Sequence, residues 1–349
     1  MNVIHKPLFD PAILSEIKPL ASRFALFCDE SVADVLGKKW KEHLEKMGLS
    51  VALFTFPPGE QEKTRERKAG LEDLLFSHNF GKDCCIIAMG GGVTTDLIGF
   101  LASTFCRGVP LVLVPTTLLG MVDAAIGGKT GVNTRFGKNL IGSFYPASKI
   151  LIDPSVLNTL PPEELTNGSA EIIKYALIDS PTLFEQLQTS TLDQIVKECI
   201  AIKMRVVEED FKEGGLRRIL NFGHTIGHAI ERLENYRLSH GEAVAIGMLV
   251  ESYLSVKMGH LPMQSFQEIE ALVRSFPFPL QFSDAVTKEA MLSTLSHDKK
   301  AAKGAVRFVL LSKIGACEPF GGEYCTSVSA PLLSDTLDWM IAQFSGGQQ

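Results

Sequence analysis

Four short apolar runs in the first third of the chain constrain its fold more than any other feature. They lie at residues 24–28, 50–56, 84–89 and 111–114, with a possible last strand at 149–152. The segments between them carry helical periodicity over residues 31–47, 64–77 and 93–104. Almost continuously apolar strands that alternate with helices are typical of a parallel sheet covered on both faces. We therefore predict an α/β domain with a doubly wound, Rossmann-like parallel sheet, whose ligand lies beyond the carboxyl ends of the strands.

The chain changes character after Pro162, where helical patterns replace the alternation. Helices are predicted over residues 163–178, 181–189, 192–209, 216–233, 241–257, 266–275, 288–296 and 334–344, with β-like character at 305–311. A chain of 349 residues exceeds a single typical core. We expect an α/β domain over residues 1–160 and a mostly α-helical domain over residues 161–349.

Composition excludes several kinds of partner and compartment. The net charge of −6 argues against nucleic acid or an anionic membrane surface as a partner. No apolar run approaches the ~20 residues of a membrane span, and the first ten residues lack the apolar core of a signal peptide. The seven cysteines are odd in number and show no C-x-x-C spacing. We therefore expect reduced thiols and a cytoplasmic protein.

Polar residues follow the predicted strands where a nucleotide would bind. Gly90, Gly91 and Gly92 join a strand to a helix, so that backbone N–H groups and the helix dipole could face a pyrophosphate. This is not a G-x-G-x-x-G fingerprint, and a plain tight turn explains it equally well. Asp29 is placed as an acceptor for ribose hydroxyls, and Thr116 and Thr117 end another strand. Together these groups predict a dinucleotide site.

A glycine-rich segment over residues 119–148 has little periodicity and is predicted to be irregular and functional. It contains Lys129, Lys138 and Asn139, and Arg107 precedes the fourth strand. Surface lysines usually only solvate a face. Lysines flanked by glycines differ, because the backbone can close around an anion. We expect a phosphorylated or carboxylated substrate.

The histidines of residues 224–240 suggest a metal site. His224 and His228 are four residues apart, so they share one face of a helix, and His240 opens the next helical run. Glu171 stands in an otherwise apolar stretch, where a salt bridge to Lys174 is the simpler explanation. Core or capping histidines are the alternative for any one of the three. Glu171, His224 and His240 together suit Zn²⁺ with one position left open, and His228 would then serve acid–base chemistry or phosphate binding.

The motifs of this sequence resemble those of the 3-dehydroquinate synthase family, in the same order. They are Gly90-Gly-Gly-Val-Thr-Thr-Asp96, Pro115-Thr-Thr117, Asp123-Ala-Ala-Ile-Gly-Gly-Lys-Thr-Gly-Val-Asn133, Gly137-Lys-Asn-Leu-Ile-Gly142, Ala170-Glu-Ile-Ile-Lys174, Asn221-Phe-Gly-His-Thr-Ile-Gly-His228 and His240-Gly-Glu-Ala-Val244. The resemblance covers roughly residues 29 to 310, and its lysine and histidine blocks are highly specific.

The resemblance implies a role for each of these residues. NAD would be served by Asp29, Glu60, Lys63, Gly90, Gly91, Gly92, Asp96, Thr116, Thr117, Asp123, Lys129, Lys138 and Thr159. A divalent metal, normally Zn²⁺ with Co²⁺ as an alternative, would be held by Glu171, His224 and His240. Phosphate would meet Lys129, Asn139, His228 and Lys299, and the substrate carboxylate would meet Lys203, Arg217 and Asn221. The catalytic groups would be Asp123, Lys129, Lys138 and His228, and Arg107 would reach the active site of the neighbouring subunit in a homodimer.

The implied reaction converts 3-deoxy-D-arabino-heptulosonate 7-phosphate into 3-dehydroquinate and phosphate, in the shikimate route to aromatic compounds. It combines a transient NAD-dependent oxidation, phosphate elimination, reduction and an intramolecular aldol closure. Three alternatives stay open on the sequence alone. They are another NAD- and metal-dependent sugar-phosphate cyclase, a metal-dependent alcohol dehydrogenase, and a non-catalytic NAD- or metal-sensing protein. Arg217 and Lys203 disfavour a cyclase whose substrate lacks a carboxylate, and the lysines of residues 129–138 disfavour the dehydrogenase.

Overall fold

The structure is a computed structural model that describes residues 2–301 and 306–346, without the side chains of residues 297–301. The chain divides into two compact units, one ending at Leu165 and the other beginning at Thr166. Helix α6 (Pro162–Ile178) carries this boundary near its first turn. Among the described residues, no helix is both long enough and apolar enough to cross a membrane.

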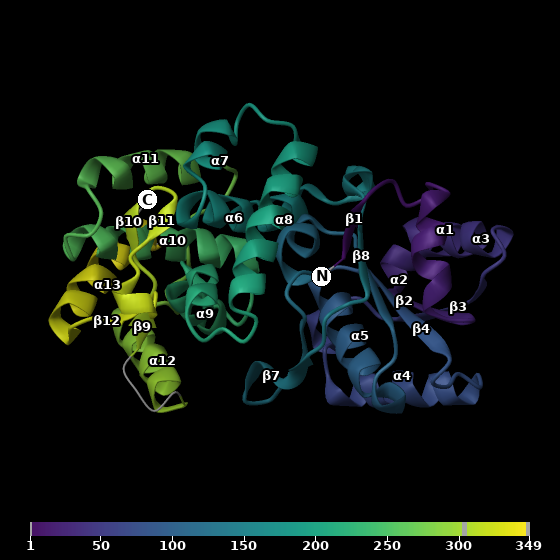
Figure 1. The fold of residues 1–349 in the computed structure, drawn as a ribbon. Helices are drawn as coiled ribbons and strands as arrows, with labels where there is room; N and C mark the ends of the chain where they lie inside the picture. The colour runs from purple at the N-terminus through teal and green to yellow at the C-terminus, as the bar shows by residue number, and fades with distance from the viewer. Residues whose placement is uncertain (1, 302–305, 347–349) are drawn as a thin grey trace. The chain divides into compact units, whose positions relative to one another are not determined.

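The first unit is built on a parallel sheet (Figure 1). Its strands are β1 (Val3–His5), β2 (Arg23–Asp29), β3 (Ser50–Phe56), β4 (Cys84–Gly90), β5 (Leu111–Pro115) and β8 (Lys149–Ile152). In the part of this unit that is described they lie in the order β1-β8-β5-β4-β2-β3, and every pairing is parallel. The predicted doubly wound α/β fold is confirmed. β1 was not predicted, because three residues are too few for a periodic signal.

Helices cover both faces of this sheet (Figure 1). They are α1 (Ala12–Ile17), α2 (Glu30–Val32), α3 (Lys38–Lys46), α4 (Arg65–Ser77) and α5 (Gly92–Thr104). Trp40 and Leu44 of α3 pack with Ile87 and Met89 of β4 in one buried cluster. The Trp40 indole also donates a hydrogen bond to the carbonyl of Leu8 over 2.9 Å. The predicted apolar stripes therefore face the sheet, as strands buried on both faces require.

The segment predicted to be irregular is instead largely a hairpin. β6 (Lys129–Thr134) and β7 (Gly137–Phe144) pair antiparallel, and a π-helical turn, η5 (Gly120–Ala124), precedes them. Glycines allow the close packing: a Cβ on Gly142 would lie 1.9 Å from the Thr130 carbonyl oxygen, and one on Gly99 of α5 would lie 2.6 Å from Thr130 Cγ2. Contacts made through bare backbone leave no alternating apolar pattern in the sequence, so the prediction was wrong here.

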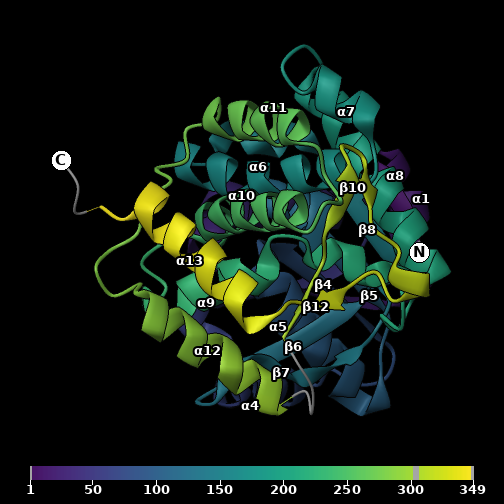
Figure 2. The same cartoon turned by 90° about the vertical axis from the view of Figure 1, so that its left-hand side faces the viewer.

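The second unit is mostly helical (Figure 2). After α6 come α7 (Pro181–Gln186), α8 (Leu192–Glu209), α9 (His224–Leu233), α10 (His240–Lys257), α11 (Met263–Arg274), α12 (Lys288–Ala301) and α13 (Ala330–Phe344). Helix α10 is buried along most of its length and packs against α9, α11 and α13. Short strands complete the unit: β9 (Arg307–Phe308) pairs with β12 (Thr326–Ser327), and β10 (Leu311–Lys313) pairs with β11 (Ala316–Cys317). Residue 305 of the predicted β-like run lies outside the described residues.

The helix predicted over residues 216–233 is broken. A 3-10 helix, η7 (Leu216–Asn221), ends before Phe222, and α9 begins at His224. Gly223, between them, has a left-handed conformation with φ of 79°, which a glycine adopts without strain. Apolar periodicity continues across the break, so this periodicity does not predict it. The consequence is functional, because His224 becomes the first residue of a helix.

Candidate active site

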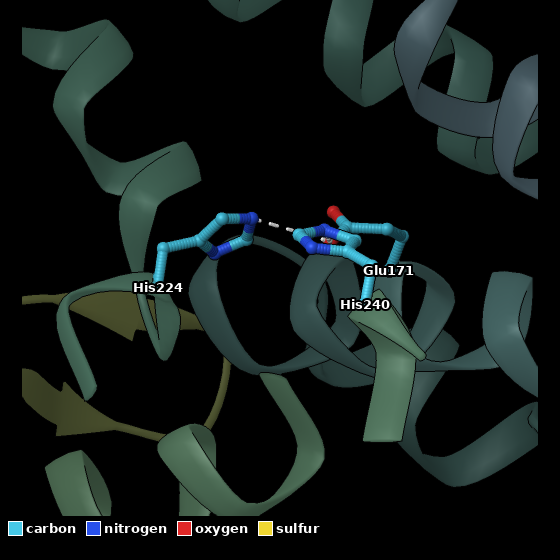
Figure 3. A group of neighbouring side chains, drawn as sticks. All are labelled: Glu171, His224 and His240. Carbon is cyan, nitrogen blue, oxygen red and sulfur yellow. Dashed lines mark ion pairs between the residues drawn. The ribbon is translucent and has the colours of Figure 1, made fainter. Parts of the chain in front are cut away.

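Glu171, His224 and His240 converge in the second unit (Figure 3). Glu171 comes from the middle of α6, whereas the histidines are the first residues of α9 and α10. The Nε2 atoms of His224 and His240 each lie 3.4 Å from Glu171 Oε1. One potential ligand atom from each residue falls within 4.8 Å of the others. The structure thus brings together the residues predicted to bind metal.

The other ring nitrogen of each histidine is held by an acceptor. His224 Nδ1 lies 3.0 Å from the Phe222 carbonyl oxygen, and His240 Nδ1 lies 2.8 Å from Glu231 Oε1. Because a carbonyl or carboxylate oxygen only accepts, each Nδ1 carries the proton and each Nε2 faces Glu171. Histidines that ligate metals are usually oriented in this way. Glu231 was not predicted, although it follows His224 by seven residues on the same helical face.

The Glu171 carboxylate is completely buried and forms an ion pair with Lys174. Burial raises its pKa, but Lys174 and the two imidazoles oppose this and hold the pKa of Glu171 well below its ordinary value. Among the described residues, neither carboxylate oxygen accepts a hydrogen bond of normal geometry. The salt bridge considered as the simpler explanation is therefore present, yet it leaves acceptor capacity that a bound cation would use.

His240 lies between two carboxylates. Burial lowers its pKa, but the neighbouring carboxylates of Glu171 and Glu231 outweigh burial and raise the pKa of His240 to about 10. Without a metal, this imidazole is therefore a cation at neutral pH. A divalent cation at the same place would replace that proton and keep the buried carboxylates neutralised, so the donor set fits a metal such as Zn²⁺.

A second set of potential ligands shares His240. One atom each from His228, Glu231 and His240 also falls within 4.8 Å of the others. The His228 ring centroid lies 5.2 Å from that of His224 and 5.9 Å from that of His240. His228 is exposed, and the Glu231 carboxylate already accepts the His240 Nδ1 proton. We therefore assign Glu231 to the support of His240 and regard the buried set with Glu171 as the better metal site.

The residues expected to bind the substrate carboxylate lie on α8 and η7, which pack together. Arg217 is 1% exposed, and its Nη1 donates to the Phe211 carbonyl over 2.7 Å. Asn221 Nδ2 donates to Glu213 over 2.7 Å, and Lys203 is buried. A buried guanidinium and a buried ammonium are side chains of the kind that suit an anion. The side chain of Lys299, expected at the phosphate, lies outside the described residues.

Several of the residues predicted to bind the nucleotide lie at one edge of the sheet in the first unit. The chain runs from β2 to β3 on one side and then to β4 on the other, so the carboxyl ends of β2 and β4 form a topological switch point. Asp29 ends β2, and its carboxylate accepts a hydrogen bond from the Val32 amide over 3.0 Å. Gly90 ends β4, and Gly91 is the N-cap of α5.

The next strand brings its threonines to the same edge. The Thr116 amide donates to the Gly90 carbonyl over 3.0 Å, and Thr117 Oγ1 accepts from the Gly120 amide over 3.0 Å. A Cβ added at Gly91 would lie 3.1 Å from Thr117 Cγ2, and one at Gly90 would lie 2.4 Å from Thr94 Oγ1. A side chain is therefore excluded at Gly90 and would be tight at Gly91, just before α5 begins. The N-terminal amides of such a helix are suited to a phosphate.

A network of charged groups joins η3 (Glu60–Glu62) to α5 and β6. Lys63 Nζ lies 2.6 Å from Asp96 Oδ2, and Asn133 Nδ2 donates to Glu60 over 2.6 Å. Burial raises the pKa of Asp96, and Lys63 opposes the shift. The predicted cofactor residues Glu60, Lys63 and Asp96 are therefore in one connected region.

The remaining predicted residues of this unit occupy turns and the hairpin. Asp123 is in η5, Lys129 begins β6, and Lys138 and Asn139 are in β7. Asn139 has φ of 56°, and its amide donates to Asn133 Oδ1 over 3.0 Å. Thr159 ends η6 (Pro154–Thr159), is exposed, and donates to the Val156 carbonyl. Arg107 is exposed in η4 (Phe105–Arg107).

Comparison with known proteins yields consistent matches. A family model described as 3-dehydroquinate synthase N-terminal matches residues 53–167, and one described as 3-dehydroquinate synthase C-terminal matches residues 168–301. A 3-dehydroquinate synthase of Desulforamulus reducens is 41% identical over 318 residues, which are 88% of each chain.

Solved structures of two cyclases are also similar. The 2-epi-5-epi-valiolone synthase of Streptomyces hygroscopicus subsp. jinggangensis, solved with NAD⁺ and Zn²⁺, has a TM-score of 0.87 and 29% identity, covering 98% of this chain and 96% of its own. A 2-deoxy-scyllo-inosose synthase complexed with carbaglucose-6-phosphate, NAD⁺ and Co²⁺ has a TM-score of 0.85 and 26% identity, covering 96% of this chain and 95% of its own.

Proposed function

The chain belongs to the 3-dehydroquinate synthase family, and from this premise we propose that Glu171, His224 and His240 bind the divalent metal of its reaction. The resemblance predicted from the motifs is confirmed. The enzyme converts 3-deoxy-D-arabino-heptulosonate 7-phosphate into 3-dehydroquinate and phosphate, with NAD and a divalent metal as cofactors. The observation that supports the metal site most directly is the convergence of two imidazole Nε2 atoms on one buried carboxylate oxygen, 3.4 Å from each.

The protein side of this site supplies charge and orientation. When bound, Zn²⁺ would acidify a substrate hydroxyl and NAD⁺ would accept the hydride from the same carbon. The Phe222 carbonyl and the Glu231 carboxylate each hold an Nδ1 proton, so both Nε2 lone pairs are directed to one place. Glu171 contributes the negative charge, and Lys174 keeps that carboxylate ionised. His228, exposed beside His224, is proposed to exchange protons with the substrate or contact its phosphate.

We assign NAD to the carboxyl edge of the parallel sheet. Its pyrophosphate would face the amides at the start of α5, where Gly90, Gly91 and Gly92 carry no side chain. Asp29, at the end of the neighbouring strand, would accept from ribose hydroxyls. The other members of the proposed cofactor site are Glu60, Lys63, Asp96, Thr116, Thr117, Asp123, Lys129, Lys138 and Thr159.

The substrate carries a carboxylate and a phosphate, and the chain offers cations for both. We propose that Lys203, Arg217 and Asn221 bind the carboxylate, since they are grouped on α8 and η7. Lys129, Asn139, His228 and Lys299 are proposed for the phosphate. Asp123 and Lys138 are proposed as further catalytic groups. Such fixed charges act mainly by positioning the substrate and stabilising charge that develops as phosphate departs.

We further propose a cytoplasmic homodimer of the shikimate route in which Arg107 reaches the partner's active site. Cys106 and Arg107 have φ of 50° and 68°, and Gly108 follows with φ of 107°. Consecutive left-handed residues other than glycine are strained, and such strain is concentrated at functional sites. The turn presents the exposed Arg107 side chain away from its own unit's core. All seven cysteines lie in the described ranges as free thiols, which suits a reducing compartment.

A phosphate-release assay tests the function. With 3-deoxy-D-arabino-heptulosonate 7-phosphate, NAD⁺ and Zn²⁺, the purified protein should release phosphate and form 3-dehydroquinate without accumulating NADH. Omission of NAD⁺ or addition of a chelator should stop the reaction. The similar 2-deoxy-scyllo-inosose synthase, solved with carbaglucose-6-phosphate, makes a cyclase acting on a sugar phosphate without a carboxylate the second candidate. Turnover of such a substrate, with none of the heptulosonate phosphate, would establish that candidate instead, and net NADH production from simple alcohols would indicate the dehydrogenase.

A further inference from the structure

Glu251 is a completely buried carboxylate on α10 for which none of the proposed catalytic steps has a use. It follows His240 by eleven residues, about three helical turns, and so lies on the same face of α10 as this metal ligand. A carboxylate is costly to bury unless hydrogen bonds compensate for the lost water. The partners of Glu251 therefore indicate what it is for.

Those partners are backbone amides on either side of His224. Glu251 Oε2 accepts from the Gly223 amide over 2.8 Å, and Oε1 accepts from the Ile226 amide over 3.3 Å. The first amides of a helix have no partner within the helix. Gly223, the N-cap of α9, has no side chain that could satisfy them. Glu251 supplies the missing acceptors from a neighbouring helix.

The N-terminal end of α9 also packs closely against α10 at this point. A Cβ on Gly223 would lie 2.6 Å from Met248 Cγ, and one on Gly247 would lie 1.9 Å from the Gly223 carbonyl oxygen. Two glycines therefore let the start of α9 rest directly on α10, one turn before Glu251. The backbone that carries His224 is therefore held in two ways. It packs against α10 at Gly247 and Met248, and its amides donate to the Glu251 carboxylate.

We propose that Glu251 is a positioning residue for the metal site, holding the first turn of α9 so that His224 Nε2 meets Glu171 and His240. This inference rests on the proposed metal site. It gives α10 two roles, because the helix supplies one ligand at its N-terminus and fixes another through Glu251. The hydrogen bond from His224 Nδ1 to the Phe222 carbonyl involves the residue next to Gly223, so displacement of this turn would also disturb the orientation of the imidazole.

The competing explanation is that Glu251 only caps a helix and contributes stability. Glu234, at the opposite end of α9, offers a matched control. It is 4% exposed, and its Oε1 accepts from the Ser283 amide over 2.6 Å. Like Glu251 it is a buried glutamate that accepts from a backbone amide, but that amide is Ser283's, outside α9, and its carboxylate also pairs with Arg237. It lies ten residues from His224, so it tests the loss of a buried glutamate of α9 without disturbing the first turn.

The experiment compares zinc affinity with stability in Glu251→Leu, Glu251→Gln, Glu234→Leu and Glu234→Gln. Zinc affinity is measured by competition with a chromophoric chelator, and stability by thermal unfolding of the metal-free protein. Glu251→Leu should weaken zinc binding about 10- to 100-fold, as loss of an outer support of a ligand typically does. Glu251→Gln should weaken it less but measurably, because its amide group must face a backbone N–H. The Glu234 variants should lose stability and bind zinc like the wild type.

Wild-type zinc affinity in folded Glu251→Leu would overturn the proposal, as would an equal loss of affinity in the Glu234 variants. If Glu251→Leu does not fold, wild-type zinc affinity in Glu251→Gln would also overturn the proposal. His224→Ala separates this failure from failure of the metal site itself. If His224→Ala loses zinc while Glu251→Leu retains it, only the role of Glu251 is wrong; if His224→Ala retains it, both proposals fall.

Discussion

Glu231 accepts the Nδ1 proton of His240 over 2.8 Å, which ties a residue near the end of α9 to the residue that begins α10. This bond orients the imidazole and increases its basicity as a ligand. Glu231→Leu should therefore raise the zinc dissociation constant by about 10- to 100-fold. Glu231→Gln keeps an acceptor but loses the charge, so its effect should be smaller. Chelator competition measures both, and wild-type affinity in the two variants would show that His240 needs no such support.

The protonation of His240 predicts how zinc binding depends on pH. Its pKa in the metal-free protein is raised from 6.5 to about 10, so the proton must leave before Nε2 can bind a metal. Zinc affinity should increase as pH rises from 6.5 towards 10. Titration calorimetry at pH 8 in buffers of different ionisation enthalpy should detect about one proton released for each zinc bound. Release of none would mean that His240 is already neutral.

The same pKa shift predicts the stability of the metal-free protein. A folded-state pKa raised above the unfolded value contributes stability that is fully present below pH 6.5 and is lost as pH rises through about 10. The thermal unfolding temperature of the metal-free protein should accordingly fall as pH rises over this interval. His240→Gln removes the titrating group, so its unfolding should depend less on pH in the same range. An equally steep dependence in this variant would assign the effect to other groups.

The buried guanidinium of Arg217 should contribute mainly to substrate binding. Arg217→Ala removes the charge of a side chain that is 1% exposed. Its loss should lower kcat/KM by a factor equivalent to on the order of 2–4 kcal/mol, chiefly through a higher KM. Arg217→Lys keeps the charge but not the planar fork, so it should restore only part of the effect. Steady-state kinetics on the heptulosonate phosphate, together with zinc content, provide the check. An unaltered KM in a folded Arg217→Ala variant would contradict the carboxylate role.

The sequence predicted those parts of the molecule whose signal is local. Strands β2 to β5 were foreseen because each is apolar along almost its whole length. The convergence of Glu171, His224 and His240 was foreseen because charged and imidazole side chains are rare in apolar helical stretches. The β6–β7 hairpin was missed because its packing uses glycine backbone, as at Gly142, and so leaves no side-chain pattern. Glu231 and Glu251 were missed for another reason: both are ordinary helical glutamates until the fold places an imidazole or a helix terminus beside them.

Gly91 allows the nucleotide site to be tested apart from the metal site. A Cβ at this N-cap would lie 3.1 Å from Thr117 Cγ2, at the amides proposed for the pyrophosphate. Gly91→Ala should therefore weaken NAD⁺ binding, measured by titration calorimetry. Zinc affinity should stay at the wild-type value, because the proposed metal ligands belong to the other unit.

Gly70, within α4, is the matched control, since a Cβ there would meet nothing within 4 Å. Gly70→Ala should leave NAD⁺ affinity unchanged and stabilise the helix by about 0.5–1 kcal/mol. Equal NAD⁺ affinity in the wild type and in Gly91→Ala would exclude the start of α5 as the pyrophosphate site. A comparable loss of affinity in Gly70→Ala would instead mean that NAD⁺ binding responds to any change in this unit's helices. Only a loss confined to Gly91→Ala agrees with the proposed geometry, because only there is the new methyl group placed at the N-cap of α5.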